Sequence, residues 1–300
     1  MTERPAPAIA KYKRTPAAIH IFLILCSVIF IIPFMIVVSA SLTDDAVLSW
    51  NGFSLFIPKF DIIAYRFLFT NPKIILNAYT VTMFIAAVGT AGGVLVMSMI
   101  AYSLSRNVFF LRKQVTFILF FPALFNGGLV SSYIINSHYL KLRDSVWVLI
   151  LPGLINIFHV IIFRTFFKQL PSSIFEAAKI DGASEFRLFF TILLPLSKPV
   201  LATIAFLTAL GKWNEWYNAM LYINNDRLMP LQYQLQRMMM DLAVLKRSME
   251  YFPAAVSRDK IPGENLRMAM LVVSIGPMLI FFPAFQKYFT KGITIGSIKG

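Results

Sequence analysis

Side chains that could perform chemistry are few in this sequence and lie far apart. The three histidines are His20, His138 and His159, and the single cysteine is Cys26. Isolated histidines are more often interfacial or pore-lining residues than metal ligands or catalytic groups, and one cysteine in an apolar run disfavours metal ligation. The phosphate-binding pattern G-x-x-x-x-G-K-[ST] is absent, so the chain itself is not expected to bind ATP in a P-loop. The sequence therefore predicts no catalytic, cofactor-binding or metal-binding residues.

A short cluster of aromatic and polar residues has the chemistry to bind a solute instead. It consists of Trp213, Asn214, Glu215, Trp216, Tyr217 and Asn218. Aromatic rings can stack on the apolar C–H faces of a sugar, while amides and a carboxylate can pair with its hydroxyl groups. The same tryptophan and tyrosine residues are equally typical of an aromatic belt at a membrane surface. Both interpretations remain open at this point.

Two asparagines inside apolar runs, Asn126 and Asn156, are further candidates for a solute path. An amide in an apolar environment is costly unless it is hydrogen-bonded, so these side chains are expected to face polar partners. Asn126 stands in an Asn-Gly-Gly sequence, which equally favours a simple break in a helix. Gly89 and Gly93 have the four-residue spacing that favours close helix packing.

Residues 176–199, EAAKIDGASEFRLFFTILLPLSKP, form a charged, helix-forming segment between long apolar runs. Ser173 and Glu176 fit a capping box at the start of a helix. Gly182 suits the left-handed position that ends a helix, and Ser184 can cap a second helix. Pro195 and Pro199 are expected to stop that helix and direct the chain into the next apolar run. The expected structure is helix, glycine turn, helix.

This order of residues resembles the EAA motif of ABC-importer permeases, E-A-A-x-x-x-G followed further on by I-x-L-P. The matching positions are Glu176, Ala177, Ala178, Asp181, Gly182, Ala183, Ile192, Leu194 and Pro195. The Trp-Asn-Glu run that begins at Trp213, and the carboxyl-terminal KYFTKGITIGSIKG, resemble the carbohydrate-uptake branch, similar to the smaller subunit of maltose-type permeases. The resemblance extends over residues 15–300.

The resemblance implies a type I ABC-importer permease fold, with a cytoplasmic coupling loop at residues 169–199 in which the motif residues contact an ATPase. It also implies a heterodimer with a homologous permease, a pair of cytoplasmic ATPase subunits that hold ATP and Mg, and an extracytoplasmic solute-binding protein. ATP-driven closure of the ATPases is expected to move the coupling loop and switch the permeases between inward- and outward-facing states.

Composition independently indicates an all-α polytopic membrane protein. Hydrophobic residues make up 58% of the chain and charged residues 14%, whereas soluble domains average about 45–50% apolar residues. The apolar residues occur in runs near the ~20 residues needed to cross ~30 Å of hydrocarbon. Six such spans are predicted, at residues 19–42, 76–104, 115–135, 146–167, 200–221 and 268–285.

The net charge of +14 raises the alternative of a nucleic-acid partner, but the positive residues are distributed by membrane topology. The tails, the predicted inner loops and the flanks of the motif loop contain Arg4, Lys11, Lys13, Arg14, Arg106, Arg112, Lys113, Arg164, Lys168, Lys179, Arg187, Lys198, Lys287, Lys291 and Lys299. The two shorter outer loops contain only Lys59, Arg66, Lys73, Lys141 and Arg143. Because positive residues favour the cytoplasmic side, both termini are expected in the cytoplasm, with loops 43–75, 136–145 and 222–267 outside. No nucleic-acid partner is expected.

The first apolar run is too long for a cleavable signal. It covers residues 19–42, against about 7–15 residues for a signal h-region. We therefore expect a cytoplasmic tail at residues 1–18 and a single transmembrane permease domain at residues 19–300. The polar loop 222–267, with Gln232, Gln234 and Gln236 alternating, could receive a binding protein.

The sequence thus favours the membrane subunit of an importer that obtains its energy from a partner. No pair of carboxylates lies within a predicted span, which disfavours the intramembrane ion relay of a secondary carrier. A membrane enzyme would need clustered His, Asp or Glu residues, which are missing. The expected solute is a carbohydrate, an oligosaccharide in particular, and the alternatives are another small polar solute or an ion-coupled carrier.

Overall fold

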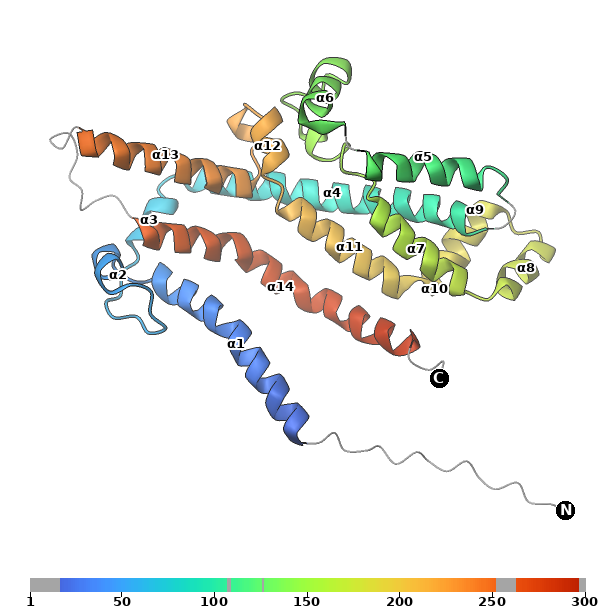
Figure 1. Ribbon diagram of the computed structural model, residues 1–300, viewed down its shortest axis with the longest axis horizontal. Coiled ribbons are helices and arrows are strands. Elements are labelled where there is room, and N and C mark those ends of the chain that lie inside the picture. The colour runs from blue at the N-terminus through green and yellow to red at the C-terminus, as the bar shows by residue number, and fades with distance from the viewer. Residues whose placement is uncertain (1–16, 107–108, 126, 252–262, 297–300) are drawn as a thin grey trace. The chain divides into compact units, whose positions relative to one another are not determined.

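The computed structural model describes residues 17–106, 109–125, 127–251 and 263–296 (Figure 1). These residues fold into helices, and the β-structure among them is one isolated bridge between Thr43 and Phe60. The expectation of an all-α fold is confirmed. The chain separates into two compact units, the first formed by residues 1–68 and 258–272 and the second by residues 69–257 and 273–300.

The first unit contains α1 (Ala17–Ser41), α2 (Asp45–Asn51), α3 (Ile63–Leu68) and the beginning of α14 (Glu264–Gly296). Asp44 caps the start of α2, because its carboxylate accepts hydrogen bonds from the amides of Ala46 and Val47. Asn265 at the start of α14 is fully buried, and its side chain donates to the Thr43 carbonyl at 3.3 Å. This contact joins the two sequence segments of the unit.

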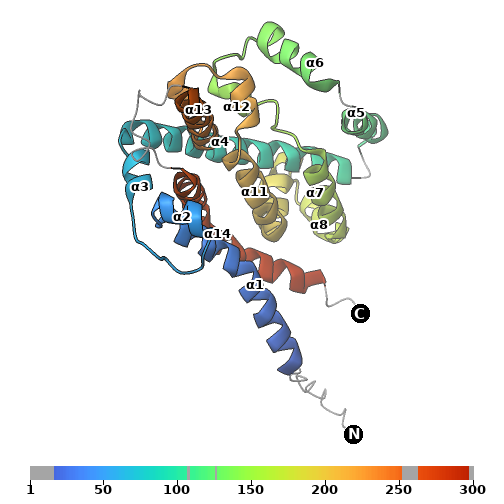
Figure 2. The same cartoon turned by 60° about the vertical axis from the view of Figure 1, so that its left-hand side comes forward.

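The second unit is built around α4 (Pro72–Ser105), which packs against α7 (Ile157–Gln169), α11 (Lys198–Trp213) and α13 (Leu231–Tyr251) (Figure 2). Its other elements are α5 (Arg112–Leu124), α6 (Gly128–Ile134), a π-helical turn at Ile135–Tyr139, a 3-10 turn at Val146–Leu149, α8 (Ser172–Ile180), α9 (Glu185–Arg187), a π-helical turn at Leu188–Leu193, α10 (Leu194–Leu196), α12 (Tyr217–Tyr222) and a 3-10 turn at Asp226–Leu228.

Glycines on α4 allow the neighbouring chain segments to approach it closely. A Cβ on Gly93 would lie 3.1 Å from the Leu154 carbonyl oxygen, and one on Gly89 would lie 3.2 Å from the Lys212 side chain. Such separations are too short for an ordinary carbon contact. The structure therefore supports the predicted packing role of this glycine pair.

The six predicted spans are not all continuous helices. α1, α4 and the Glu264–Phe281 part of α14 are each long and apolar enough to cross a membrane, and two bent helix pairs could raise the number to five among the described residues. The predicted span at residues 146–167 is interrupted, because residues 150–156 are not helical and α7 has only 13 residues. A helix of that length rises about 20 Å. Pro152 and Gly153 account for the interruption, since neither favours a continuous helix.

Candidate functional site

The coupling loop (residues 169–199) contains the glycine turn that the sequence predicts. Gly182 follows α8 with a φ of +78°. Its amide donates to the Lys179 carbonyl at 3.0 Å, and the Ala183 amide donates to the Ala178 carbonyl at 2.9 Å. These two bonds form a Schellman motif, which ends a helix with one left-handed residue. The prediction of a left-handed Gly182 is confirmed.

The predicted capping box at Ser173 is wrong. α8 begins at Ser172, directly after Pro171, and its first amides have no side-chain cap. Proline has a fixed φ and no amide hydrogen, so a helix can start beside Pro171 without a serine cap. Glu176 therefore lies inside the helix with an exposed side chain.

The second half of the coupling loop begins at a serine cap and ends at a sharp bend. The Ser184 hydroxyl accepts a hydrogen bond from the Arg187 amide at 3.3 Å, as predicted. The helical path continues from Glu185 to Leu196 and then bends by 84° into α11. Ser197 lies at the bend, between Pro195 and Pro199. The predicted change of direction between the two prolines is confirmed.

Buried aromatic side chains fix the coupling loop to the body of the second unit. Phe175 on α8 and Phe189 in the π-helical turn are 1% and 3% exposed, within an apolar cluster that includes Phe163 of α7. The guanidinium of Arg106, which follows α4, lies 4.3 Å from the centre of the Phe175 ring, a favourable cation–π geometry. Both halves of the loop are therefore held against the same core.

A polar network joins the two halves of the loop to α4. The Glu185 carboxylate accepts a hydrogen bond from the Tyr102 hydroxyl at 2.5 Å and forms an ion pair with Lys179 at 2.6 Å. Burial alone raises the pKa of Glu185, but these two partners and the charge of Arg106 outweigh it and lower the pKa below its usual value. Glu185 is therefore held as a carboxylate.

The motif residues lie on the outer side of this anchored loop. Glu176, Ala177, Asp181, Gly182 and Pro195 are exposed, and Ala178, Ala183 and Ile192 are half-buried. Two apolar side chains flank the glycine turn, Ile180 at 87% exposure and Phe186 at 68%. Beside an exposed turn that is held to the core, these two side chains can contribute apolar contact area to a docked protein.

The candidate solute-path residues at the end of α11 lie in different environments. Trp213 is 4% exposed, and its indole N–H donates to the Ser274 carbonyl at 2.9 Å. Asn214 is exposed and accepts a hydrogen bond from the Gln232 amide at 3.2 Å. The Glu215 carboxylate accepts from the Asn218 amide at 3.2 Å. Trp213 thus packs against α14 in this structure, whatever role the cluster has in solute binding.

Trp216 and Tyr217 present ring surface that Trp213 does not. They are 41% and 44% exposed, and their rings meet edge to face with centres 5.7 Å apart. Asn156 is also exposed, with its side-chain oxygen accepting from the amides of Phe158 and His159 at the start of α7. Asn126 lies outside the described residues. Contact of any of these residues with a solute stays a prediction.

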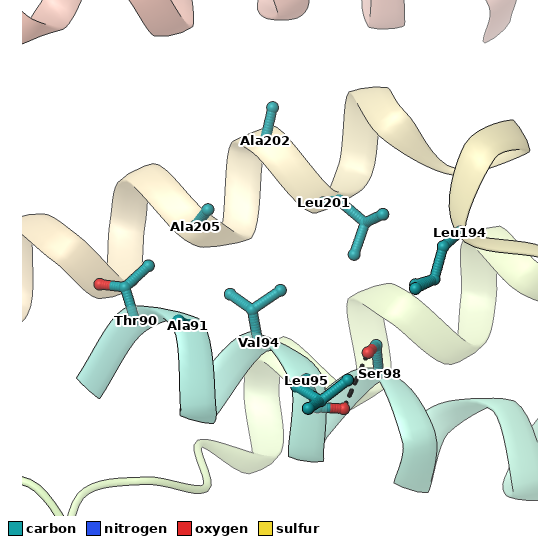
Figure 3. Close-up of a pocket in the computed structure, with 9 residues that line it drawn as sticks. All are labelled: Thr90, Ala91, Val94, Leu95, Ser98, Leu194, Leu201, Ala202 and Ala205. Atoms are coloured by element: carbon teal, nitrogen blue, oxygen red, sulfur yellow. Dashed lines mark hydrogen bonds between the residues drawn. The ribbon is translucent and has the colours of Figure 1, made fainter. Parts of the chain in front are cut away.

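An apolar pocket of about 380 Å³ lies beside α4 and α11 (Figure 3). It is lined by Thr90, Ala91, Val94, Leu95, Ser98, Leu194, Leu201, Ala202 and Ala205. The Ser98 hydroxyl donates to the Leu95 carbonyl at 2.9 Å within its own helix. With so few polar groups available, this pocket does not suit a solute rich in hydroxyl groups.

Sequence reasoning missed Tyr102 as a partner of the coupling loop. Tyr102 and Glu185 are 83 positions apart, and no local pattern links a tyrosine near the end of an apolar run to a distant acid. The available signal is a tyrosine hydroxyl near the end of the apolar run at residues 76–104, shortly before the positively charged Arg106.

Comparison with known proteins identifies the class. Residues 94–295 match the family described as "Binding-protein-dependent transport system inner membrane component", and the chain belongs to this family. It is therefore a multi-pass membrane component of an ABC transport system.

Individual relatives extend this result over nearly the whole chain. The "Polygalacturonan/rhamnogalacturonan transport system permease protein YtcP" of Bacillus subtilis is 36% identical, covering 94% of this chain and 97% of the relative. The "Arabinooligosaccharides transport system permease protein AraQ" of the same organism is 29% identical, covering 99% of both chains. A solved bacterial ABC transporter "involved in the import of the acidic polysaccharide alginate" has a chain that superimposes with a TM-score of 0.75 at 26% identity, covering 95% of this chain and all of that chain.

Proposed function

We propose that this chain is the membrane-spanning permease subunit of an ABC importer for a carbohydrate, specifically an oligosaccharide. The observation that most supports a coupling role is the anchored helix–glycine turn–helix, which exposes Glu176, Asp181 and Gly182 while Phe175 and Phe189 fix it to the core. When a partner displaces an exposed turn that is packed firmly on the core, α4 and α11 can move with it.

In this proposal the chain does not hydrolyse ATP. Two cytoplasmic ATPase subunits bind ATP and Mg, a homologous permease completes the membrane part, and an extracytoplasmic binding protein delivers the solute. The motif residues Glu176, Ala177, Ala178, Asp181, Gly182, Ala183, Ile192 and Pro195 form the ATPase contact. Both termini lie in the cytoplasm of a bacterial-type cell, and the lipid bilayer surrounds the membrane-spanning segments of the permease domain at residues 19–300.

The proposal of an oligosaccharide rests on the relatives, which are named for transport of saccharide polymers or oligomers. The exposed rings of Trp216 and Tyr217 beside Asn214 offer suitable contacts for such a solute. Another small polar solute is the main alternative, and an ion-coupled carrier is a weaker one. A second permease and a binding lipoprotein encoded beside this gene would favour the importer.

One pocket favours an acidic oligosaccharide as a second candidate. A pocket of about 390 Å³ is lined by Lys73, Ile74, Asn77, Asp226, Arg227, Gln234, Arg237 and Asp241. The Arg237 guanidinium pairs with Asp226 at 2.5 Å, and the Asn77 side-chain amide donates to the Arg227 carbonyl at 2.8 Å. The other charged lining groups are Lys73, Arg227 and Asp241, beside the amide of Gln234. Two positive groups against one carboxylate leave the lining net positive, which suits a carboxylate-bearing sugar.

The decisive experiment is uptake by a deletion strain across a panel of neutral and acidic oligosaccharides. The proposal expects loss of uptake of at least one oligosaccharide, restored by this gene on a plasmid. Wild-type uptake of every saccharide, with loss of a different polar solute, would contradict the carbohydrate assignment while leaving the importer class intact.

A further inference from the structure

Lys212 is a buried lysine in the part of the molecule where a charge is most costly. It lies near the end of α11, within the predicted span at residues 200–221, and is only 6% exposed. Among the described residues, no carboxylate lies within ion-pair distance of its ammonium group. Charged side chains at membrane depth persist where they pair with polar groups and serve a function.

The partners of Lys212 are two backbone carbonyls at the interruption of the fourth span (residues 150–156). Its Nζ donates to the Leu149 carbonyl at 2.7 Å and to the Ile150 carbonyl at 3.2 Å. These carbonyls stand where the 3-10 turn ends and helical hydrogen bonding stops. Because the hydrocarbon region offers no water to satisfy them, the ammonium replaces the missing helical donors.

The surrounding backbone leaves room for this side chain and little else. A Cβ on Gly153 would lie 3.1 Å from the Lys212 Nζ, and one on Gly89 would lie 3.2 Å from its Cε. A Cβ on Gly93 would lie 3.1 Å from the Leu154 carbonyl oxygen. Glycines on α4 and in the interruption thus leave space for the Lys212 side chain. This side chain connects α11 to α4 and to the interruption.

Most residues of the interruption are nevertheless exposed in this chain. Leu151 and Ile155 are 47% and 44% exposed, and Pro152, Gly153 and Asn156 are also exposed. Non-helical backbone at membrane depth is tolerated where it is covered by protein or lines a water-filled cavity. In transporters, interrupted helices commonly surround the solute site.

We propose that Lys212 is a positioning residue whose ammonium holds the interruption at residues 150–156 in the form that lines the solute path. This inference rests on the proposed transport function. Lys212 is not proposed to contact the solute itself, because its side chain is buried and its ammonium donates to the Leu149 and Ile150 carbonyls.

The first test compares two lysine-to-methionine changes in the complete importer complex. Lys212→Met keeps the length of the side chain but removes both hydrogen bonds, whereas Lys113→Met alters an exposed lysine of α5 that lies outside the coupling loop. At equal amounts of assembled complex, Lys212→Met should lower the ratio of stimulated to basal ATP hydrolysis by at least about ten-fold, since even one hydrogen bond to a charged group corresponds to a factor of this size. Lys113→Met should leave this ratio unchanged.

A second test does not depend on the identity of the solute. In a Cys26→Ser background, Asn156→Cys should react with a membrane-impermeant thiol reagent, while Ile24→Cys in the apolar run of α1 should not. Adding Lys212→Met should change the labelling rate at position 156 several-fold. If the wild-type complex takes up no oligosaccharide but shows this labelling pattern, the solute assignment is contradicted and the proposal about Lys212 is not.

Alanine substitutions of Gly153 and Gly92 keep the proposal testable if Lys212→Met prevents assembly. Gly153→Ala places a methyl 3.1 Å from the ammonium, whereas Gly92→Ala places one 3.5 Å from Leu154 Cδ1, an ordinary contact. Gly153→Ala should reduce the stimulated ATPase ratio and Gly92→Ala should not. Wild-type ratios in Gly153→Ala, or labelling at position 156 that is absent or unaffected by Lys212→Met, overturn the proposal.

Discussion

At the scale of single residues, Gly182 is the position where backbone conformation most directly limits which side chain is tolerated. Its φ of +78° is unfavourable for residues with a Cβ, yet nothing lies within 4 Å of where that Cβ would be. Substitution therefore acts through strain of roughly 1–2 kcal/mol and through the surface offered to a partner, and not through a clash within this chain.

We expect Gly182→Val to leave the permease in the membrane but to reduce ATPase association or solute-stimulated hydrolysis. Glu176→Lys should do the same by reversing an exposed charge in the proposed contact. Both are measured by purifying the complex through a tag on this chain and determining the co-purifying ATPase and its turnover. Gly182→Asn is the matched control, because asparagine tolerates the left-handed region. Wild-type values for both test variants would contradict the docking assignment.

Tyr102 gives a prediction about pH. The pKa of Glu185 is lowered in the folded protein, so its contribution to stability is present above the unfolded-state pKa and is lost as pH falls through the folded-state pKa. Tyr102→Phe removes one hydrogen bond to this carboxylate and should destabilise the complex at neutral pH by about 1 kcal/mol.

Thermal unfolding of wild type and Tyr102→Phe at neutral and acidic pH measures this effect. The difference in Tm should shrink as the pH falls through the folded-state pKa of Glu185, because the protonated acid no longer attracts the hydroxyl as strongly. Tyr79→Phe is a control, since the Tyr79 hydroxyl donates to the backbone carbonyl of Val273, which does not titrate. A constant difference at all pH values would refute the link to Glu185.

At the scale of elements, local signals in the sequence were sufficient for the coupling loop. Gly182, Ser184 and the two prolines each fix the backbone through their own chemistry, so their positions predicted the turn, the cap and the bend. Ser173 failed because Pro171, two residues earlier, already permits a helix start. The preference for a serine cap at Ser173 competes with the fixed φ of Pro171, and the proline determines where this helix starts.

The interruption at residues 150–156 was missed for a different reason. Pro152 and Gly153 stand within a long apolar run, and hydropathy averaged over such a run does not respond to two helix-breaking residues. The contact of Lys212 with Leu149 joins positions 63 residues apart, so no sequence pattern could pair them. The burial of Trp213 could likewise not be predicted from the sequence. Tryptophan is equally suited to an aromatic belt at the membrane surface, to contact with a solute and to packing between helices.

The junction of α11 and α12 supports a prediction about the solute. Trp216→Ala and Asn214→Ala should raise the KM for uptake while assembly is unchanged. The first loses stacking on the sugar, which contributes about 1 kcal/mol of binding, and the second loses a hydrogen bond to a sugar hydroxyl. Trp213→Phe is the comparison, since it deletes the hydrogen bond to Ser274 and should lower stability without changing the KM. Unaltered kinetics in both alanine variants would leave the exposed rings as a membrane belt.

At the scale of the whole molecule, composition and charge were enough to predict a polytopic helical membrane protein, and family membership agrees. The number of spans depends on whether the bent pairs and the interrupted segment cross the membrane. Within the described residues, three helices are continuous and long and apolar enough to cross a membrane, and any further crossing there needs a bent pair or a broken element. Broken elements at membrane depth need polar partners from the protein itself, as Lys212 provides for residues 149 and 150.

Orientation in the membrane is the remaining whole-molecule prediction. Lysine and arginine are more frequent in the tails and the predicted inner loops than in the two short outer loops, so both ends and the coupling loop should lie in the cytoplasm. In a Cys26→Ser background, single cysteines at Lys11, Asp61, Ser184 and Ser257 are treated in whole cells with an impermeant thiol reagent. Positions 61 and 257 should be labelled, while 11 and 184 should react only after the membrane is permeabilised, which also controls for accessibility. Labelling of Ser184→Cys in intact cells, with none at Asp61→Cys, would reverse the orientation and place the coupling loop beyond the reach of any cytoplasmic ATPase.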